Sequence, residues 1–246
     1  MSELPVITRA NVIVPGSVWS EIDLNVAAVT THRELMTRLG LGVRRGVLLA
    51  GPPGVGKTVI SQVIANELAG AFTVITVDAR AEQSALAGVY REARTLGPTL
   101  IVLEDLDLIV GDRRKSADTR ALSEFLAVMD TDPSAPILTL ASTNDVSTLD
   151  AASIRTARFD SIIEIGYPTR EAAAHILSTY LQGVPGGESI DVGTVAAHFS
   201  TDISGADIRE IVRRTVLASG LATQAGLIAT VQSGRFKAQL PQGHYL

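Results

Sequence analysis

The chain has 246 residues, of which 46% are hydrophobic, enough for one large domain or for a domain with a small appendage. Charged residues make up 19% and the formal net charge is −5, which argues against a dedicated nucleic-acid-binding protein, because such proteins usually carry a basic face. The absence of cysteine excludes disulfides, thiolate metal sites and cysteine nucleophiles. Because the N-terminal residues and the rest of the chain lack a long apolar run, we expect a cytoplasmic protein without a signal peptide or membrane contact.

Short apolar runs alternate with segments of helical spacing over the first two thirds of the chain. A continuous apolar run such as Leu100–Leu103 is typical of a strand that is covered on both faces. Strands are expected at 46–50, 72–77, 100–103, 136–141 and 161–165. Helices are expected at 25–40, 58–68, 82–96 and 117–130. This alternation predicts an α/β fold with a parallel sheet.

The pattern changes at Gly166-Tyr167-Pro168, beyond which only helical spacing is found. Helices are expected there at 171–182, 192–198, 205–219 and 222–232. We therefore expect four parts in the chain, which are an N-terminal arm, an α/β core, a small all-helical domain and a C-terminal tail. Their expected bounds are 1–20, 21–167, 168–235 and 236–246.

A glycine-rich segment connects the first expected strand to the helix that follows it. It reads Gly51-Pro52-Pro53-Gly54-Val55-Gly56-Lys57-Thr58, which has the form G-x-x-x-x-G-K-[ST]. Between a strand and a helix, the backbone N–H groups of such a loop and the helix N-terminus face phosphates. Lys57 would contact the β- and γ-phosphates of a bound triphosphate, and the Thr58 hydroxyl would ligate Mg²⁺. Val59, the next residue, is also expected to contact the nucleotide. The alternative is a glycine-rich turn that binds no ligand.

Acidic residues follow the most apolar of the expected strands. Leu100–Leu103 leads directly into Glu104-Asp105-Leu106-Asp107. In a phosphate-loop site, one carboxylate at a strand tip holds Mg²⁺ through water and its neighbour polarises the attacking water. The alternative is an acidic turn after a buried strand.

With these motifs in place, the chain resembles an AAA-type ATPase module of the AAA+ superfamily, from Val18 to the end of the 205–219 helix. The most specific stretch is Ala141–Asn144, Leu149–Ala152 and Ile154–Asp160, which resembles the family pattern A-T-N-x-x-x-x-L-D-x-A-x-x-R-x-G-R-F-D. The resemblance implies a phosphate-loop NTPase core, with a five-stranded and mainly parallel sheet between helices, and a small all-α lid domain after it.

The resemblance also assigns roles to three polar residues. Asn144 sits at the position whose amide senses the γ-phosphate and orients water, and the alternative is an asparagine that forms a turn. Arg155 matches the arginine finger that reaches into the site of a neighbouring subunit, and Arg158 matches the second arginine of the pair. A guanidinium that faces the γ-phosphate stabilises charge in the transition state. The alternative for both arginines is a surface salt bridge.

Further nucleotide contacts are implied by the same resemblance. Ile22 matches the segment that packs near the adenine, and Tyr180 falls where many relatives carry a histidine that contacts the nucleotide. Ser204–Asp207 matches the S-G-A-D motif of the family's helical lid, which places Gly205 and Ala206 at the nucleotide. Alanine then stands where other AAA+ branches carry a sensor-2 arginine.

Two departures from the family pattern bear on activity. The family usually has aspartate then glutamate after the third strand, whereas here Glu104 takes the metal-side place and Asp105 the catalytic place. This order also occurs in some AAA branches, so it is compatible with hydrolysis. Family translocases insert an aromatic pore loop before the helix at 82–96, but residues 78–84 contain no aromatic residue. We therefore expect hydrolysis without the threading of an unfolded polypeptide.

The resulting expectation is an ATPase that uses ATP, ADP and Mg²⁺ in a ring of copies of itself, six by family resemblance, and acts on a protein substrate or adaptor. One alternative is a switch that assembles on ATP without hydrolysing it. A second is a DNA-handling AAA+ ATPase, against which the acidic balance and the missing sensor-2 arginine count.

Overall fold

The computed structural model describes residues 7–77, 83–110, 129, 132–144 and 159–237. It divides the chain into two compact units. The first comprises Met1–Arg9, Pro15–Pro52 and Lys57–Ile165, and the second comprises Ala10–Val14, Pro53–Gly56 and Gly166–Leu246.

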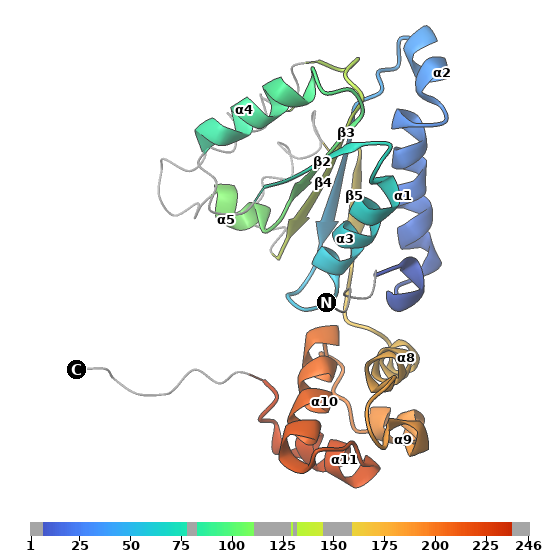
Figure 1. Cartoon of the computed structure of the whole chain (residues 1–246), viewed down its shortest axis with the longest axis vertical. Coiled ribbons are helices and arrows are strands. Elements are labelled where there is room, and N and C mark those ends of the chain that lie inside the picture. The colour runs from blue at the N-terminus through green and yellow to red at the C-terminus, as the bar shows by residue number, and fades with distance from the viewer. Residues whose placement is uncertain (1–6, 78–82, 111–128, 130–131, 145–158, 238–246) are drawn as a thin grey trace, which may run out of the picture. The chain divides into compact units, whose positions relative to one another are not determined.

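A five-stranded parallel sheet forms the centre of the first unit (Figure 1). The strands are β1 (Arg45–Ala50), β2 (Thr73–Val77), β3 (Thr99–Leu103), β4 (Ile137–Thr143) and β5 (Ser161–Glu164). They lie in the order β2-β3-β4-β1-β5, and each neighbouring pair is parallel. The five expected strands and the α/β class are therefore confirmed, and the sheet is parallel throughout rather than mainly so.

Helices cover both faces of this sheet. The helices α1 (Gly16–Val29) and α3 (Lys57–Leu68) pack on one face, and α4 (Gln83–Ala93) packs on the other (Figure 1). Residues of β3 and β4 are buried throughout, because neighbours cover them on both faces. On the α4 side, Leu86 and Tyr90 pack with strand residues such as Leu48 and Ile101.

Parallel pairing brings the carboxyl ends of the central strands to one edge of the sheet. Ala50 of β1 lies opposite Thr143 of β4, and Leu103 of β3 lies opposite Ala141. The residues that follow β1, β3 and β4 therefore meet at this edge. In open parallel sheets, ligands bind in the crevice outside the carboxyl ends of the strands.

Two helical segments of the first unit differ from expectation. The helix expected at 25–40 is two helices, α1 and α2 (Arg33–Arg38), and α1 begins at Gly16, within the segment expected to be an irregular arm. The break occurs at Thr30, whose hydroxyl donates to the Val26 carbonyl at 2.7 Å and caps α1 locally. A short helix, α5 (Leu106–Val110), was not expected. The helix expected at 117–130 lies outside the described residues, apart from residue 129.

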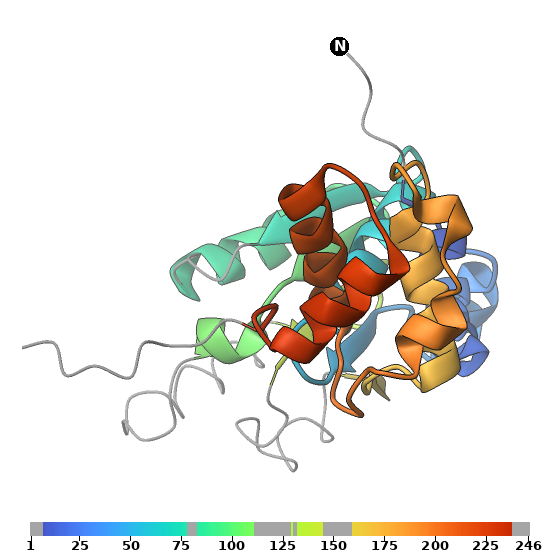
Figure 2. The ribbon, with the colours of Figure 1, turned by 90° about the horizontal axis from the view of Figure 1, so that it is seen from below.

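The second unit contains α8 (Arg170–Leu181), α9 (Val192–Ala196), α10 (Gly205–Ser219) and α11 (Gln224–Ser233), shown in Figure 2. These helices confirm the four that were expected after Gly166. Thr169, Asp191, Ser204 and Thr223 each accept a backbone N–H at a helix start. Such caps satisfy N–H groups that have no partner inside the helix. The helices enclose a second apolar core, which includes Leu177, Ile208 and Leu227.

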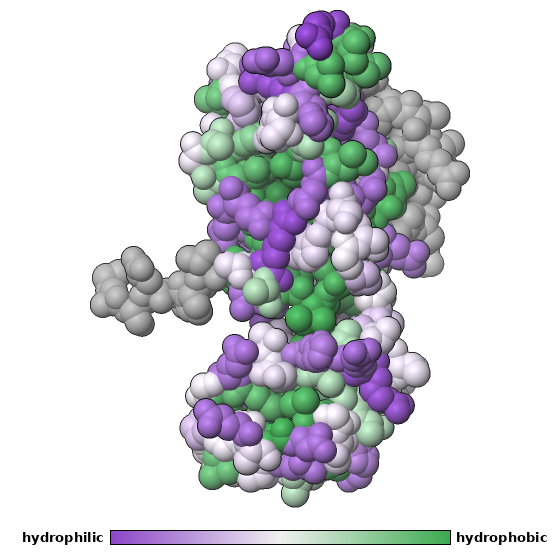
Figure 3. All heavy atoms as spheres, turned by 90° about the vertical axis from the view of Figure 1, so that its right-hand side faces the viewer, coloured by the Kyte–Doolittle hydropathy of each residue, from purple (hydrophilic) through white to green (hydrophobic). Residues whose placement is uncertain are grey.

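Apolar side chains lie exposed on the α1–α2 side of the first unit, where Figure 3 shows green areas among purple ones. They are Leu24, Leu35, Leu39 and Leu41. Burial of such area in an assembly would be favourable, because it would be removed from water. Within the described part of the chain, none of the helices has both the length and the apolar character that a membrane crossing requires.

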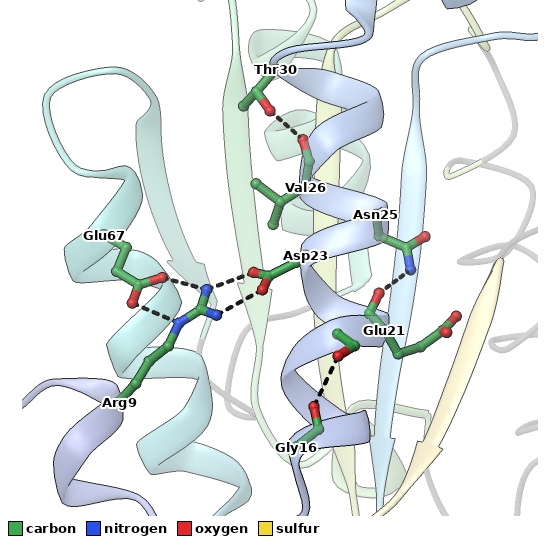
Figure 4. Close-up of polar contacts among 9 residues, drawn as sticks. Arg9, Gly16, Glu21, Asp23, Asn25, Val26, Thr30 and Glu67 are labelled. Carbon is green, nitrogen blue, oxygen red and sulfur yellow. Dashed lines mark hydrogen bonds and ion pairs between the residues drawn. The ribbon is translucent and has the colours of Figure 1, made fainter.

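Arg9 ties the segment before α1 to two helices of the first unit (Figure 4). Its Nη1 and Nη2 donate to Asp23 of α1 at 2.8 and 2.6 Å, and its Nε and Nη2 donate to Glu67 of α3 at 2.8 Å each. The guanidinium carbon also lies 4.8 Å from the centroid of the Trp19 ring. Glu67 is in the last turn of α3, where a carboxylate opposes the helix dipole. Arg9 therefore compensates a local repulsion and joins three segments.

We expect Arg9→Ala to lower the free energy of unfolding by about 1–2 kcal/mol, because the network is bidentate but partly exposed to water. Hydrogen bonds from Arg9 hold the pKa of Asp23 below its ordinary value. Because folding lowers the pKa of this carboxyl, its ionised form stabilises the folded protein at pH values above the pKa of the unfolded chain, which is about 4. This stabilisation is lost as the pH falls through the lower pKa of the folded protein. The difference between wild type and variant should therefore narrow below about pH 4.

Urea denaturation at neutral and acidic pH measures this difference directly. Arg38→Ala, which removes an exposed arginine of α2, is the matched control and should change stability by no more than about 0.5 kcal/mol. Equal effects of the two substitutions at neutral pH would contradict the role of Arg9.

Candidate functional site

The glycine-rich loop leaves β1 at Gly51 and enters α3 at Lys57. Gly54 and Gly56 have φ angles of +80° and +107°, which residues with a Cβ rarely adopt. With these conformations, successive backbone N–H groups of the loop can form a concave site that binds a phosphate. Within the second unit, which includes Pro53–Gly56, the Gly54 carbonyl accepts a hydrogen bond from the Ala206 N–H at 3.1 Å.

Gly51 stands where the loop passes closest to another strand. A Cβ at this position would lie 2.0 Å from the carbonyl oxygen of Ile165. That approach follows from the pairing of β1 with β5, which continues in the hydrogen bond from Ile165 N to the Ala50 carbonyl at 2.7 Å. Only glycine allows the sheet to remain paired up to the start of the loop.

We expect Gly51→Ala to lower the free energy of unfolding by about 3 kcal/mol, because backbone atoms must move to admit the methyl group. Gly88→Ala on α4 is the control, since a Cβ there meets nothing within 4 Å. That helical substitution should be neutral or stabilise by up to about 1 kcal/mol. Urea denaturation of both variants checks the contrast, and an unchanged stability for Gly51→Ala would contradict it.

Lys57 is a buried cation whose three donors are all used. The residue is only 6% exposed. Its Nζ donates hydrogen bonds to the carbonyl oxygens of Gly51 and Pro52 at 2.6 and 2.8 Å, and to Asn144 Oδ1 at 2.9 Å. Burial lowers the pKa of Lys57, and the charges of Asp105 and Asp107 oppose that effect. All three acceptors are neutral oxygens, so an anionic phosphate oxygen would be a stronger partner for the ammonium.

Asn144 connects this cation to an acid. Its Oδ1 accepts from Lys57, and its Nδ2 donates to Asp105 Oδ1 at 3.0 Å. The two neighbours determine the orientation of the amide, because an ammonium only donates and a carboxylate only accepts. Lys57, Asn144 and Asp105 come from the ends of three segments and form one hydrogen-bonded line.

Asp105 has an unusual backbone conformation. Its φ is +51°, and it is the one non-glycine residue with a positive φ in the described ranges. Left-handed backbone costs a residue with a Cβ about 1–2 kcal/mol. Hydrogen bonds on both sides hold it there, since Asp105 N donates to Ser142 Oγ at 3.3 Å and Leu108 N donates to the Asp105 carbonyl at 2.8 Å. Strain of this kind is typically found at functional positions.

The residues expected to ligate magnesium lie at the same edge of the sheet. Thr58 is exposed in the first turn of α3, and Glu104 is half-buried directly after β3. Among the residues that the structure describes, no cluster of three histidine, aspartate or glutamate side chains could hold a metal without other ligands. This donor set fits Mg²⁺, which usually takes one or two protein ligands and completes its shell with substrate phosphates and water.

The remaining expected contacts belong to the two different units or lie outside the described residues. Ile22 is buried in α1 of the first unit, and Val59 is half-buried in α3. Tyr180 is exposed on α8 of the second unit, where Gly205 and Ala206 form the start of α10. Arg155 and Arg158 lie outside the described residues. The roles of these residues remain predictions.

Two residues of the site were given no role on the basis of sequence. Asp107 Oδ1 accepts hydrogen bonds from Thr143 Oγ1 and from the backbone N–H of Asn144, both at 3.1 Å. Ser142 Oγ accepts from Asp105 N. The sequence showed only that polar residues stand at the ends of two apolar runs. Their contact depends on the pairing of β3 with β4, which the sequence does not indicate.

A parallel sheet in which a glycine-rich loop runs from β1 into a helix, with acids after β3 on the other side of β4, defines the phosphate-loop NTPase class. Within that class, residues 47–167 match the family described as "ATPase family associated with various cellular activities (AAA)". The match begins in β1 and includes the loop, the acids after β3 and Asn144. The chain belongs to the AAA family.

Curated relatives support this assignment. The chain is 32% identical to a cell division cycle protein 48 homolog of Archaeoglobus fulgidus over 76% of its own length and 27% of the relative. It is 34% identical to an ATP-dependent zinc metalloprotease FtsH of Marinobacter nauticus, over 74% of the chain and 31% of the relative. It is 30% identical to a proteasome-activating nucleotidase of A. fulgidus, over 80% of the chain and 50% of the relative. The chain thus spans between about a quarter and a half of these relatives.

Proposed function

We propose that this chain binds ATP with Mg²⁺ at the carboxyl ends of β1 and β3 and hydrolyses it. The observation that carries the proposal is the line Lys57–Asn144–Asp105, with contacts of 2.9 and 3.0 Å. It joins a buried cation at the phosphate loop to a carboxylate through one amide. A γ-phosphate and an attacking water need these three groups side by side. AAA family membership supports ATP as the nucleotide.

Each residue of the line has a distinct proposed role. Lys57 exchanges a neutral carbonyl partner for the β- and γ-phosphate oxygens, and the loop N–H groups bind the remaining phosphate oxygens. Asp105 accepts a proton from the water, and Asn144 keeps that water in line with the phosphorus atom. Thr58 and Glu104 would hold Mg²⁺, which, when bound, neutralises charge on the phosphate oxygens.

The rest of the nucleotide is proposed to contact residues of both units. Ile22 is proposed to lie in the segment that packs near the base, with Val59, Tyr180, Gly205 and Ala206 as further nucleotide contacts. This assignment rests on the positions of these residues in the family pattern.

We further propose that the active form is a ring of copies of this chain, six by analogy with the family. Arg155 from one copy would complete the site of its neighbour, with Arg158 beside it. A site that needs a neighbour becomes more active as the copies associate. We therefore expect the ATPase rate per chain to rise with protein concentration, and Arg155→Ala to remove this rise.

The experiment combines that concentration series with size measurements in ATP, ADP and a non-hydrolysable ATP analogue. Larger particles in ATP, together with a concentration-dependent rate, support the proposal. A rate per chain that is constant from dilute to concentrated protein, and equal in Arg155→Ala, would exclude a shared site. Assembly in ATP without phosphate release would indicate the switch that assembles but does not hydrolyse.

A protein is the proposed partner. The proteasome-activating nucleotidase and the metalloprotease among the relatives carry names that point to proteins as their targets. Residues 78–84, between β2 and the body of α4, contain no aromatic side chain to grip an extended polypeptide. We therefore propose remodelling or assembly of a protein partner without threading by an aromatic pore loop.

A further inference from the structure

We propose that Asp107 is a positioning residue for hydrolysis, because it holds the end of β4 so that the Asn144 amide lies between Lys57 and Asp105. This inference rests on the proposed function, which places Asn144 and Asp105 at the attacking water.

The contacts of Asp107 reach the backbone of the residue that it would position. Its Oδ1 accepts from the N–H of Asn144 and from the hydroxyl of Thr143, both at 3.1 Å. Thr143 is fully buried at the last position of β4, and Asp107 lies in the first turn of α5. The N–H of the half-buried Asn144 would need another partner if it lost this acceptor, so the bond helps to determine the local backbone.

This contact continues the alignment of two strands past the point at which their pairing stops. The last paired residues of β3 and β4 are Leu103 and Ala141. Beyond them, Ser142 Oγ accepts a hydrogen bond from Asp105 N at 3.3 Å. Asp107 Oδ1 accepts hydrogen bonds from the next two residues, Thr143 and Asn144. Side-chain bonds thus replace the ladder where the chain carries its reactive groups.

The hydrogen bonds made by Ser142 and Asp107 hold Asp105 and Asn144 in place relative to each other, in addition to the direct bond between these two side chains. The direct bond between their side chains is 3.0 Å long and depends on rotatable side chains at both ends. The bonds at Ser142 and Asp107 instead hold the two backbones. Catalytic groups need placement to within about 0.5 Å, which rests on such supporting contacts.

Asp107 acts through Asn144 and not on the substrate. Its Oδ1 already receives two donors, and the three donors of Lys57 go to Gly51, Pro52 and Asn144. Removal of Asp107 should therefore leave ATP affinity nearly unchanged and should slow the chemical step.

The experiment is a set of kcat and ATP-affinity measurements on Asp107→Ala, Asp107→Asn, Asn144→Ala and the double variant Asp107→Ala/Asn144→Ala. We expect Asp107→Ala to lower kcat by about tenfold or more while the ATP Kd stays within about threefold. Asp107→Asn keeps an oxygen acceptor at the same place and should retain most of the rate. If Asp107 acts only through Asn144, the double variant should be no slower than Asn144→Ala.

Asp202→Ala is the matched control, because this exposed aspartate pairs with Lys237 in the helical unit and should leave kcat unchanged. If Asp107→Ala does not fold, Thr143→Val removes one of the two donors with little change in shape and should lower kcat by a smaller factor. A wild-type kcat in Asp107→Ala, or a double variant slowed by the product of the single effects, would overturn the inference.

A second readout separates this inference from the proposed function. If Asn144→Ala itself keeps the wild-type kcat, the proposed role of Asn144 fails. The positioning is then judged by the Asn144 side-chain NH₂ signals of nitrogen-15-labelled, nucleotide-free protein. Asp107→Ala should shift these signals, and Asp202→Ala should leave them in place. Signals unmoved by Asp107→Ala would overturn the positioning independently of any activity.

Discussion

Replacing Lys57 with alanine should weaken ATP binding by at least about 100-fold, because each hydrogen bond to a charged group contributes about 1.5–3 kcal/mol and the lysine would contact two phosphates. Lys57 as a whole residue is only 6% exposed, so its ammonium group interacts mainly with the protein and not with water. Titration of the purified protein with a fluorescent ATP analogue measures the change.

Lys237→Ala is the matched control for this experiment. Lys237 is an exposed lysine that pairs with Asp202 at 2.6 Å in the helical unit, and its loss should leave the ATP affinity unchanged. Lys57→Ala also removes the donor to the Gly51 and Pro52 carbonyls, so circular dichroism should verify that the variant folds. ATP affinity within about threefold of wild type in folded Lys57→Ala would show that the loop does not bind phosphate.

The second large effect is expected at Asp105. Asp105→Asn should lower kcat by at least about 100-fold and leave ATP affinity unchanged, because general-base catalysis typically contributes about 10²–10⁴-fold. Asparagine has nearly the same shape and tolerates the positive φ of +51° at this position. Its Oδ1 can still accept from Asn144 Nδ2, so the site geometry is preserved and only the basic group is lost.

Asp132→Asn provides the comparison for this variant. Asp132 is a surface carboxylate that accepts from the backbone N–H and the hydroxyl of Ser134, remote from any proposed role in hydrolysis. Steady-state phosphate release should be normal in Asp132→Asn and lost in Asp105→Asn. Unchanged turnover in Asp105→Asn would remove Asp105 from the mechanism and would leave Glu104 as the alternative base.

Local signals in the sequence account for most of the fold. The strands stand out as apolar runs, and α10 was expected at its observed bounds, 205–219. Its ends are marked by the Ser204–Asp207 capping box and by Gly220, which adopts a left-handed conformation. Two features of the fold were not predicted from the sequence, namely the start of α1 and the helix α5. The start of α1 directly after Pro15 was missed although Val18, Ile22 and Val29 follow helical spacing, and α5 has only five residues, too few to show a period.

The site was predictable as a set of residues but not as an arrangement. Lys57, Asp105 and Asn144 each belong to a recognisable motif. Their hydrogen-bonded line depends on the strand order β3-β4-β1, which brings the end of β4 between the ends of the other two. No local pattern indicates that order. For the same reason the contact of Asp107 with Asn144, 37 residues later in the chain, is evident only in the folded structure.

Phosphate release from ATP tests the central claim most directly. The measurement uses concentrated wild-type protein with ATP and Mg²⁺, beside Lys57→Ala and Asp105→Asn at the same concentration. We predict steady release by the wild type, with both variants at the background level, Lys57→Ala unable to bind ATP and Asp105→Asn still binding it. Wild-type release no faster than that of Asp105→Asn, with ATP bound to both proteins, would contradict the claim that this site hydrolyses ATP.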